Sequence, residues 1–121
     1  MFEIRLLPGS EISQTGGRLG QITVGSFQER FACSLAFDGI EERWRQALRS
    51  MVAGAPLAVL PHDSRFAWII YREGRTCFVR QRLSLDGAFD DLLPRETISD
   101  NGMKVSEWVT TLEAIEDFLQ T

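Results

Sequence analysis

This sequence of 121 residues is poor in the side chains on which metal binding and catalysis most often depend. It contains one histidine and two cysteines. Cys33 and Cys77 are too far apart for a C-x-x-C pair, and a structural zinc ion needs four ligands, mostly cysteine and histidine. We therefore expect two buried free thiols, no catalytic residue, no metal and no cofactor.

Long hydrophobic runs are also missing. No apolar segment approaches the roughly 20 residues that a membrane-spanning helix requires. Residues 1–5 lack the basic segment and apolar core of a signal peptide. With 44% hydrophobic and 25% charged residues, the composition is that of a globular protein large enough for one core. The sequence thus predicts a single domain over residues 1–121, in the cytoplasm and without a membrane partner.

Three short motifs invite a catalytic or binding interpretation but lack what it requires. The glycines of 16–20 are not followed by the Gly-Lys-Ser/Thr of a phosphate-binding loop. His62–Ser64 are adjacent in the chain, whereas the members of a hydrolase triad come from separate segments, so a solvated turn is expected. Asp90-Asp91 lacks the regular ligand spacing of a calcium loop. It predicts a solvated acidic loop, or an acidic loop that contacts a partner.

The stretch Arg65–Tyr71 organises the predicted fold. It has apolar residues at both alternating sets of positions, which indicates a strand covered on both faces. A tight turn follows at Gly74, because glycine adopts the positive φ that such a turn needs. Thr76–Leu83 then alternates, with Phe78 as the exception, as in the second strand of a hairpin. We expect one core that includes Trp44, Phe66, Trp68, Ile70 and Val79.

Further strands are predicted where apolar and polar residues alternate, with a bend or bulge at Gly25-Ser26. These strands are Phe2–Leu7, Leu19–Phe27, Gln28–Phe37 and Leu57–Leu60. A helix is expected from an N-cap at Asp38 to Gly54, with one buried face made of Ile40, Trp44, Leu48 and Met51.

The end of the chain carries two clear local signals. Asn101-Gly102 predicts a small type I′ hairpin. Thr110–Glu113 predicts a capping box for a last helix, in which Leu112, Ile115 and Leu119 are buried and Phe118 flanks them. The predicted class is α+β: a mostly antiparallel sheet of about six strands, with a central helix and a C-terminal helix packed on it and a small β-hairpin near the C-terminus.

Charge is distributed unevenly along the chain. Residues 84–121 carry nine acidic and two basic side chains, a net charge of −7, whereas residues 1–83 carry eight acidic and eleven basic ones, a net charge of +3. An acidic final third is a poor binder of nucleic acid and a good match for a basic protein.

Several stretches taken together resemble a family of bacterial immunity proteins. They are Gly20–Phe27, Trp44–Leu48, Trp68–Gly74, and Pro94–Gly102 with Val105–Trp108. This family comprises small cytoplasmic proteins that accompany the toxins of contact-dependent growth inhibition. The resemblance implies that the chain binds a cognate toxin C-terminal domain and blocks it. Such toxins are often nucleases with basic clefts, and the family has no shared signature of functional residues to transfer.

The leading hypothesis is therefore an immunity protein whose acidic surface binds a basic toxin surface. Buried aromatic or apolar anchors would hold such a complex, and Trp108, Phe89 and Leu92 are candidates. The candidate partner-binding residues are Asp86, Asp90, Asp91, Glu96, Asp100 and Trp108.

Two other functions stay open at this point. One is a nucleic-acid or phosphate-binding module on an arginine-bearing strand face, where Phe78 would stack a base; its cations are Arg72, Arg75, Arg80 and Arg82. The other is an enzyme that uses two carboxylates, because their separation in space does not follow from sequence. We expect no nucleic-acid partner.

Overall fold

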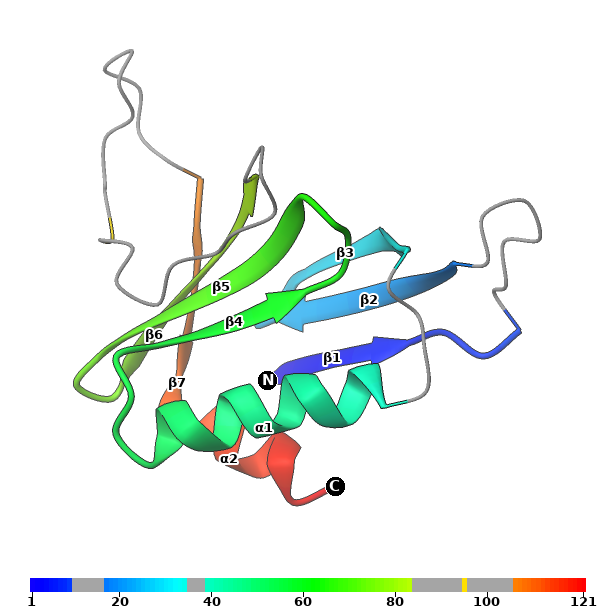
Figure 1. Cartoon of the computed structure of the whole chain (residues 1–121). Helices are drawn as coiled ribbons and strands as arrows, with labels where there is room; N and C mark the ends of the chain where they lie inside the picture. The colour runs from blue at the N-terminus through cyan, green and yellow to red at the C-terminus, as the bar shows by residue number, and fades with distance from the viewer. Residues whose placement is uncertain (10–16, 35–38, 84–94, 96–105) are drawn as a thin grey trace, which may run out of the picture.

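The structure, a computed structural model, describes residues 1–9, 17–34, 39–83, 95 and 106–121 (Figure 1). Within these ranges, the order up to β6 and the two helices are as the sequence predicts, and the strand β7 was not predicted. The elements are β1 (Phe2–Leu6), β2 (Arg18–Val24), β3 (Phe27–Cys33), α1 (Ile40–Val52), β4 (Leu57–Pro61), β5 (Phe66–Glu73), β6 (Thr76–Leu83), β7 (Trp108–Thr111) and α2 (Leu112–Leu119). The predicted hairpin at Asn101-Gly102 lies outside the described residues.

The strands form two sheets. β1, β2 and β3 make a three-stranded sheet in chain order, and β4, β5, β6 and β7 make a four-stranded sheet, also in chain order. Every neighbouring pair of strands is antiparallel. The predicted α+β class with mostly antiparallel strands is therefore confirmed, and the strands are divided between two sheets where one sheet of about six was expected.

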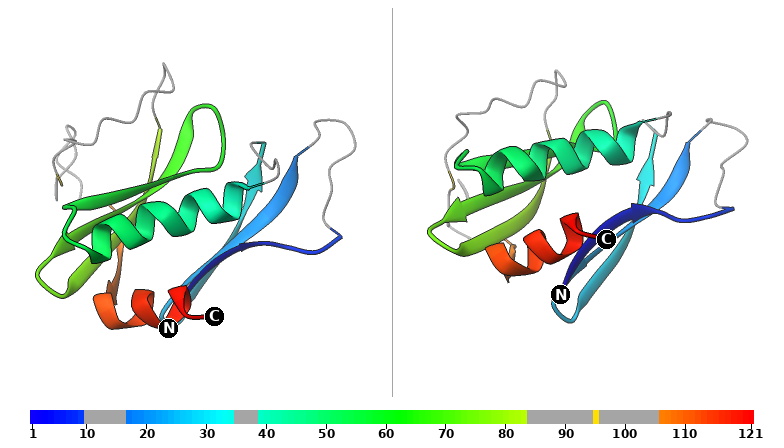
Figure 2. Two further views of the ribbon diagram at one scale, coloured as in Figure 1. Left: turned by 60° about the horizontal axis from the view of Figure 1, so that its bottom comes forward. Right: turned by 90° about the horizontal axis from the view of Figure 1, so that it is seen from below.

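Both helices lie on the same side of the sheets, as the views in Figures 1 and 2 show. α1 packs on β4 and on α2, and α2 packs on β1 and β7. Because β1 and β7 belong to different sheets, α2 fastens the two sheets together. The ring of Phe2 meets that of Phe118 edge to face, which places the N-terminus beside α2. No helix in the described ranges is long and apolar enough to cross a membrane.

α1 has its predicted buried face but a different beginning. Its N-cap is Gly39, with φ 95° and no side-chain hydrogen bond, so the expected cap at Asp38 is wrong. Asp38 itself lies outside the described residues. The carboxylate of Glu41 accepts a hydrogen bond from the backbone N–H of Leu6 at 3.3 Å, which ties the first turn of α1 to the end of β1. The predicted stripe of Ile40, Trp44, Leu48 and Met51 is buried.

α2 begins one residue later than expected. The hydroxyl of Thr111 accepts a hydrogen bond from the backbone N–H of Ala114 at 3.2 Å, so Thr111 is the N-cap. Thr110, the expected cap, is instead buried in β7, where it pairs with Cys77. Phe118 is buried and Leu119 only partly so, the reverse of the prediction.

One hydrophobic core joins both sheets and both helices. Its largest fully buried side chains are Trp44 of α1 and Trp68 of β5, and Ile22 of β2 and Ile115 of α2 pack into the same core. Cys33 and Cys77 are buried free thiols within it, as predicted. The ring nitrogen of Trp44 donates a 2.8 Å hydrogen bond to the carbonyl oxygen of Pro61.

The central hairpin is buried on its second face as well. Gly74 makes the turn between β5 and β6 with φ 65°, as expected. On the face away from the main core lies a smaller apolar cluster of Ala67, Ile69 and Tyr71, packed against Leu57, Val59 and Phe78. The prediction of a strand covered on both faces is therefore confirmed.

A tight turn replaces the bend that the sequence suggested at Gly25-Ser26. Val24 pairs with Phe27, so Gly25 and Ser26 form the whole two-residue loop of a hairpin. Gly25 has φ 62°, and a positive φ at the first loop position is what a type II′ turn requires. β2 and β3 are therefore directly connected neighbours.

Candidate functional site

The candidate site lies where the two sheets part, along the inward side of β3. Alternate residues of a strand point to the same side, and the inward set of β3 includes Phe27, Glu29, Phe31 and Cys33. Phe31 and Cys33 are buried and Phe27 is partly buried, whereas Glu29 is exposed. A charged residue in an otherwise apolar inward series shows that the core is open to solvent at this position.

One contact between the sheets lies beside Glu29, at the start of β3. The ring of Phe27 stacks on that of Trp108 in β7, with 3.8 Å between centroids and 12° between planes. On the other side of Glu29, the ring of Phe31 lies over Gly20 of β2. A Cβ at Gly20 would overlap that ring, so this position needs glycine.

A second contact between the sheets runs through His62. Its Nδ1 lies 3.0 Å from the carbonyl oxygen of Ala32 in β3, and its Nε2 lies 2.9 Å from the amide nitrogen of Gln81 in β6. A carbonyl oxygen only accepts, so Nδ1 carries the proton and Nε2 accepts from Gln81. The residue is 3% exposed, and burial lowers the pKa of His62 below its usual 6.5. The ring is therefore neutral near pH 7, with both nitrogens occupied by the protein.

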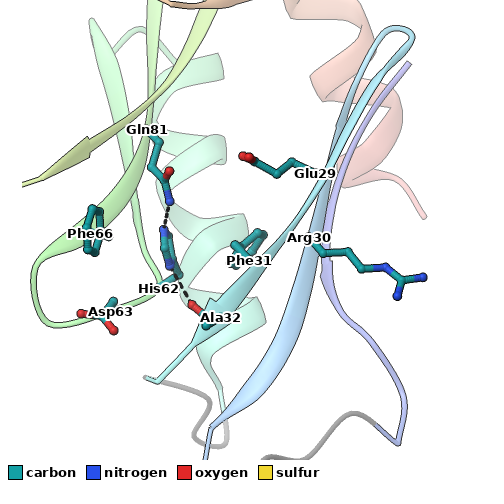
Figure 3. Close-up of a pocket in the computed structure, with 8 residues that line it drawn as sticks. All are labelled: Glu29, Arg30, Phe31, Ala32, His62, Asp63, Phe66 and Gln81. Carbon is teal, nitrogen blue, oxygen red and sulfur yellow. Dashed lines mark hydrogen bonds between the residues drawn. The ribbon is translucent and has the colours of Figure 1, made fainter.

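A cleft with a volume of about 310 Å³ opens beside these contacts (Figure 3). The side chain of Glu29 points into the cleft towards Gln81, whereas that of Arg30 points away from it. The charges that face the cleft are thus carboxylates. Its lining consists of Glu29, Arg30, Phe31, Ala32, His62, Asp63, Phe66 and Gln81.

The two carboxylates differ in how they are held. Asp63 accepts hydrogen bonds from the hydroxyl of Ser34 at 2.9 Å and from the backbone N–H of Arg65 at 3.2 Å. These bonds hold the pKa of Asp63 below its usual 3.8. The side chain of Glu29 makes no hydrogen bond or ion pair with the parts of the chain that the structure describes. Within the described part of the chain, its carboxylate is therefore not engaged.

Phe66, which lines the cleft, lies at an exposed end of a hairpin. Phe66 and Leu83 are cross-strand partners at the end of the β5–β6 hairpin and are 39% and 54% exposed. Phe66 was expected in the core with Trp44 and Trp68, and this prediction is wrong. The hairpin extends past the core at this end, so Phe66 faces the ring of His62, with 6.2 Å between centroids.

Of the predicted partner-binding residues, Trp108 lies in the described part of the chain. Trp108 lies in β7, partly buried, and its stacking on Phe27 gives it a packing role between the sheets. The other candidate anchors, Phe89 and Leu92, lie outside the described residues. So do the predicted acidic residues Asp86, Asp90, Asp91, Glu96 and Asp100.

The arginines of the β5–β6 hairpin make hydrogen bonds and ion pairs within the protein. Arg72 donates to the carbonyl oxygens of Met51 and Val52 at the end of α1, at 2.7 and 3.0 Å. Arg82 donates to the hydroxyl of Tyr71 at 3.0 Å. Arg80 and Arg75 form ion pairs with glutamates, Glu107 and Glu113 respectively. The face of Phe78 is covered by Arg95, whose guanidinium carbon lies 3.5 Å from the ring centroid.

The described residues offer neither a metal centre nor a hydrolase triad. Among them, no three histidine, cysteine or acidic side chains gather as metal ligands. Ser64 Oγ donates to Asp63 at 3.3 Å, and His62 is bonded to Ala32 and Gln81. The triad interpretation therefore fails, and the solvated turn predicted for His62 is also wrong, because the ring is buried between the sheets.

Sequence reasoning missed Glu29, His62 and Phe66 as the residues that shape this cleft. A signal for Glu29 was present: it shares its side of the strand with Phe31 and Cys33, so a charge falls on the inward face. For His62 and Phe66 no local pattern exists, since their positions depend on how the β4–β5 turn meets β3.

Comparison with known proteins was made by family, by sequence and by structure. The family described as CdiI N-terminal domain matches residues 35–118. No curated protein sequence matches the chain. A solved structure, "CdiA-CT/CdiI toxin and immunity complex from Enterobacter cloacae", has a chain 22% identical to this one, with a TM-score of 0.78 over 99% of this chain and 97% of that chain. At that identity the likeness shows a shared fold. The family match covers most of the chain, which therefore belongs to the CdiI family, the immunity proteins of contact-dependent growth inhibition.

Proposed function

We propose that this protein neutralises a cognate toxin by binding the toxin's C-terminal domain directly. Membership of the CdiI family carries the proposal. The solved structure with the same fold, which contains a toxin with its immunity protein, supports it. Inhibition by occupancy needs no catalysis, so we propose a non-enzymatic inhibitor that acts in the cytoplasm as one domain over residues 1–121.

We further propose that acidic residues of the last third contribute to this binding. The support is the net charge of −7 on residues 84–121. Two of the nine acidic residues there, Glu107 and Glu113, are engaged in ion pairs within the chain. The residues proposed to face a basic toxin surface are Asp86, Asp90, Asp91, Glu96, Asp100 and Trp108.

The function is tested with the toxin domain encoded by the neighbouring reading frame. Binding is measured by isothermal titration calorimetry, and the toxin's activity is measured with and without this protein. We expect a stoichiometric complex and loss of toxin activity, and no effect on a toxin domain from an unrelated system. Absence of binding, or binding that leaves the toxin fully active, would refute the proposal.

No observation favours the alternative nucleic-acid module. A cationic surface for phosphates needs free arginines, and those of the hairpin are bonded within the protein. Retention on heparin that falls with salt would be the simplest sign of such a surface, and we expect none.

A further inference from the structure

The cleft beside Glu29 has the chemistry of a receptor for one cationic side chain. Its volume of about 310 Å³ is at the lower end of small-molecule pockets, which suits a single long side chain. A carboxylate without a partner in the described part of the chain, Glu29, points into it, and the exposed ring of Phe66 lines it. Because Arg30 points away, no cation of the lining neutralises that carboxylate.

The imidazole of His62, which lines the cleft, carries no positive charge that would repel a cation near pH 7. Both nitrogens of His62 are occupied, by Ala32 and by Gln81, and the proton on Nδ1 is fixed by the carbonyl oxygen. The ring stays neutral and presents its face to Phe66. An anionic ligand would meet two carboxylates and no donor side chain with a full positive charge, so anions are disfavoured.

The protein itself contains an arginine held in the same kind of setting. The guanidinium of Arg95 lies over the ring of Phe78 and donates to the carboxylates of Glu73 and Glu107. A planar guanidinium can stack on a ring and bind a carboxylate with its edge at the same time, whereas a lysine ammonium is a compact and strongly hydrated charge. The cleft offers the same two kinds of partner, because the ring of Phe66 and the carboxylate of Glu29 both line it.

We propose that this cleft receives an arginine side chain of the toxin, with its guanidinium against the carboxylate of Glu29 and the ring of Phe66. The methylene groups of the arginine would lie along the apolar side chains that line the cleft. Asp63, already bonded to Ser34 and to the Arg65 N–H, would add negative potential without a direct bond. This inference rests on the proposed function, since it names the contact through which the toxin is bound.

The test uses the complete chain and the cognate toxin domain. Glu29→Gln removes the charge and keeps the shape, and we expect it to weaken binding by about tenfold or more. Asp117→Asn removes one exposed carboxylate from α2, away from the cleft, and should change the affinity less than about twofold. Phe66→Ala should also weaken binding, chiefly by faster dissociation. Thermal unfolding of each variant shows that the fold is intact.

Chemical footprinting identifies the side chain that enters the cleft. The toxin, alone and in each complex, is treated with phenylglyoxal, which modifies arginine, and mass spectrometry locates the modified sites. We expect one toxin arginine to be protected by the wild-type protein and exposed in the complex with Glu29→Gln at saturating concentration.

Three outcomes would overturn the inference. They are an unchanged affinity of Glu29→Gln, a toxin arginine protected equally in both complexes, and the absence of any toxin arginine that the wild-type protein protects. In each of these cases the toxin still binds, so the proposed function stands. A wild-type protein that fails to bind the toxin would refute the function itself.

Discussion

His62 makes the contact between the two sheets sensitive to pH. Burial lowers its pKa in the folded state, so the unfolded chain takes up a proton first as the pH falls. The stability that comes from the neutral ring is fully present above pH 6.5. It is lost progressively as the pH falls below 6.5 towards the folded-state pKa. We therefore expect the thermal midpoint to fall on acidification in this range.

A variant without the ring isolates this effect. His62 is the only histidine in the sequence, so His62→Asn removes the titration, at the cost of lower stability throughout. Carboxylates begin to take up protons near pH 4.5. Between about pH 4.5 and pH 6.5, the thermal midpoint of this variant should therefore vary less than that of the wild type. Parallel curves for the two proteins would show that His62 does not titrate differently in the folded state.

The two core tryptophans should respond unequally to replacement by phenylalanine. Both side chains are fully buried, but Trp44 donates its ring N–H to Pro61, whereas the ring nitrogen of Trp68 has no partner in the described part of the chain. Trp44→Phe leaves a buried carbonyl oxygen without its donor, while Trp68→Phe removes a donor that has no acceptor. We expect Trp44→Phe to cost about 1–3 kcal/mol more in free energy of unfolding. Urea denaturation of both variants measures the difference, and equal costs would contradict it.

Single residues of the core followed from the sequence, but those of the cleft did not. Alternation along a strand places Trp68 and Val79 inside because each is surrounded by neighbours of its own sheet. Phe66 has the same parity as Trp68, yet it lies where the hairpin runs past the core and becomes exposed. The position of Glu29 depends on the gap between two sheets, which a local pattern does not contain.

At the scale of elements, an ion-pair network joins β5, β6 and the start of β7. Arg80 of β6 bonds to Glu107 at 2.5 Å, with the two side chains 3% and 13% exposed. Arg95 bonds to the same glutamate and to Glu73. Burial opposes the ionisation of Glu107, but hydrogen bonds from Arg95 and Arg80 hold its pKa below the usual value. The carboxylate is therefore charged at neutral pH and balances a buried guanidinium.

Removing that carboxylate should be costly. Glu107→Gln removes a carboxylate that pairs with the buried guanidinium of Arg80, and breaking such a buried pair typically costs about 3–5 kcal/mol. The matched control is Glu113→Gln, which breaks an ion pair with Arg75 in which both side chains are more than half exposed. The control should leave the denaturation midpoint nearly unchanged, because exposed pairs are screened by water. Similar losses in both variants would show that burial does not determine the contribution of these pairs.

The two helices show which features local sequence patterns predict and which depend on tertiary contacts. The buried face of α1 follows from apolar spacing, whereas in α2 the spacing places Leu112 and Ile115 correctly but exchanges Phe118 and Leu119. The caps are displaced by one residue, and in α2 the reason is tertiary: Thr110 is drawn into β7 by pairing with Cys77, so Thr111 becomes the cap. A capping pattern locates the end of a helix approximately. In α2, pairing in the adjoining strand determines which residue becomes the N-cap.

At the scale of the whole molecule, the division into two sheets creates the candidate site. The sheets are joined by α2, by the stacking of Phe27 on Trp108 and by His62, and the cleft lies between these contacts. The sequence predicts β1 to β6 and the antiparallel class but neither β7 nor this division, because the alternation within a strand does not show which strands share a sheet. The division into two sheets thereby gives the protein a concave surface lined by carboxylates and aromatic rings.

The uneven charge of the chain predicts how fast it meets the toxin. If the carboxylates of residues 84–108 steer a basic partner, Asp90→Lys/Asp91→Lys should lower the association rate at low salt, and the difference should shrink at high salt because ions screen exposed charges. The control is Glu116→Lys/Asp117→Lys in α2, which changes the net charge by the same four units at another place. Stopped-flow association at two salt concentrations compares them. Equal rates for the Asp90/Asp91 variant and the wild type in both conditions, with the fold intact, would move the binding surface away from the acidic segment. Slowing of both variants alike would instead show that net charge, not the position of these carboxylates, governs the encounter.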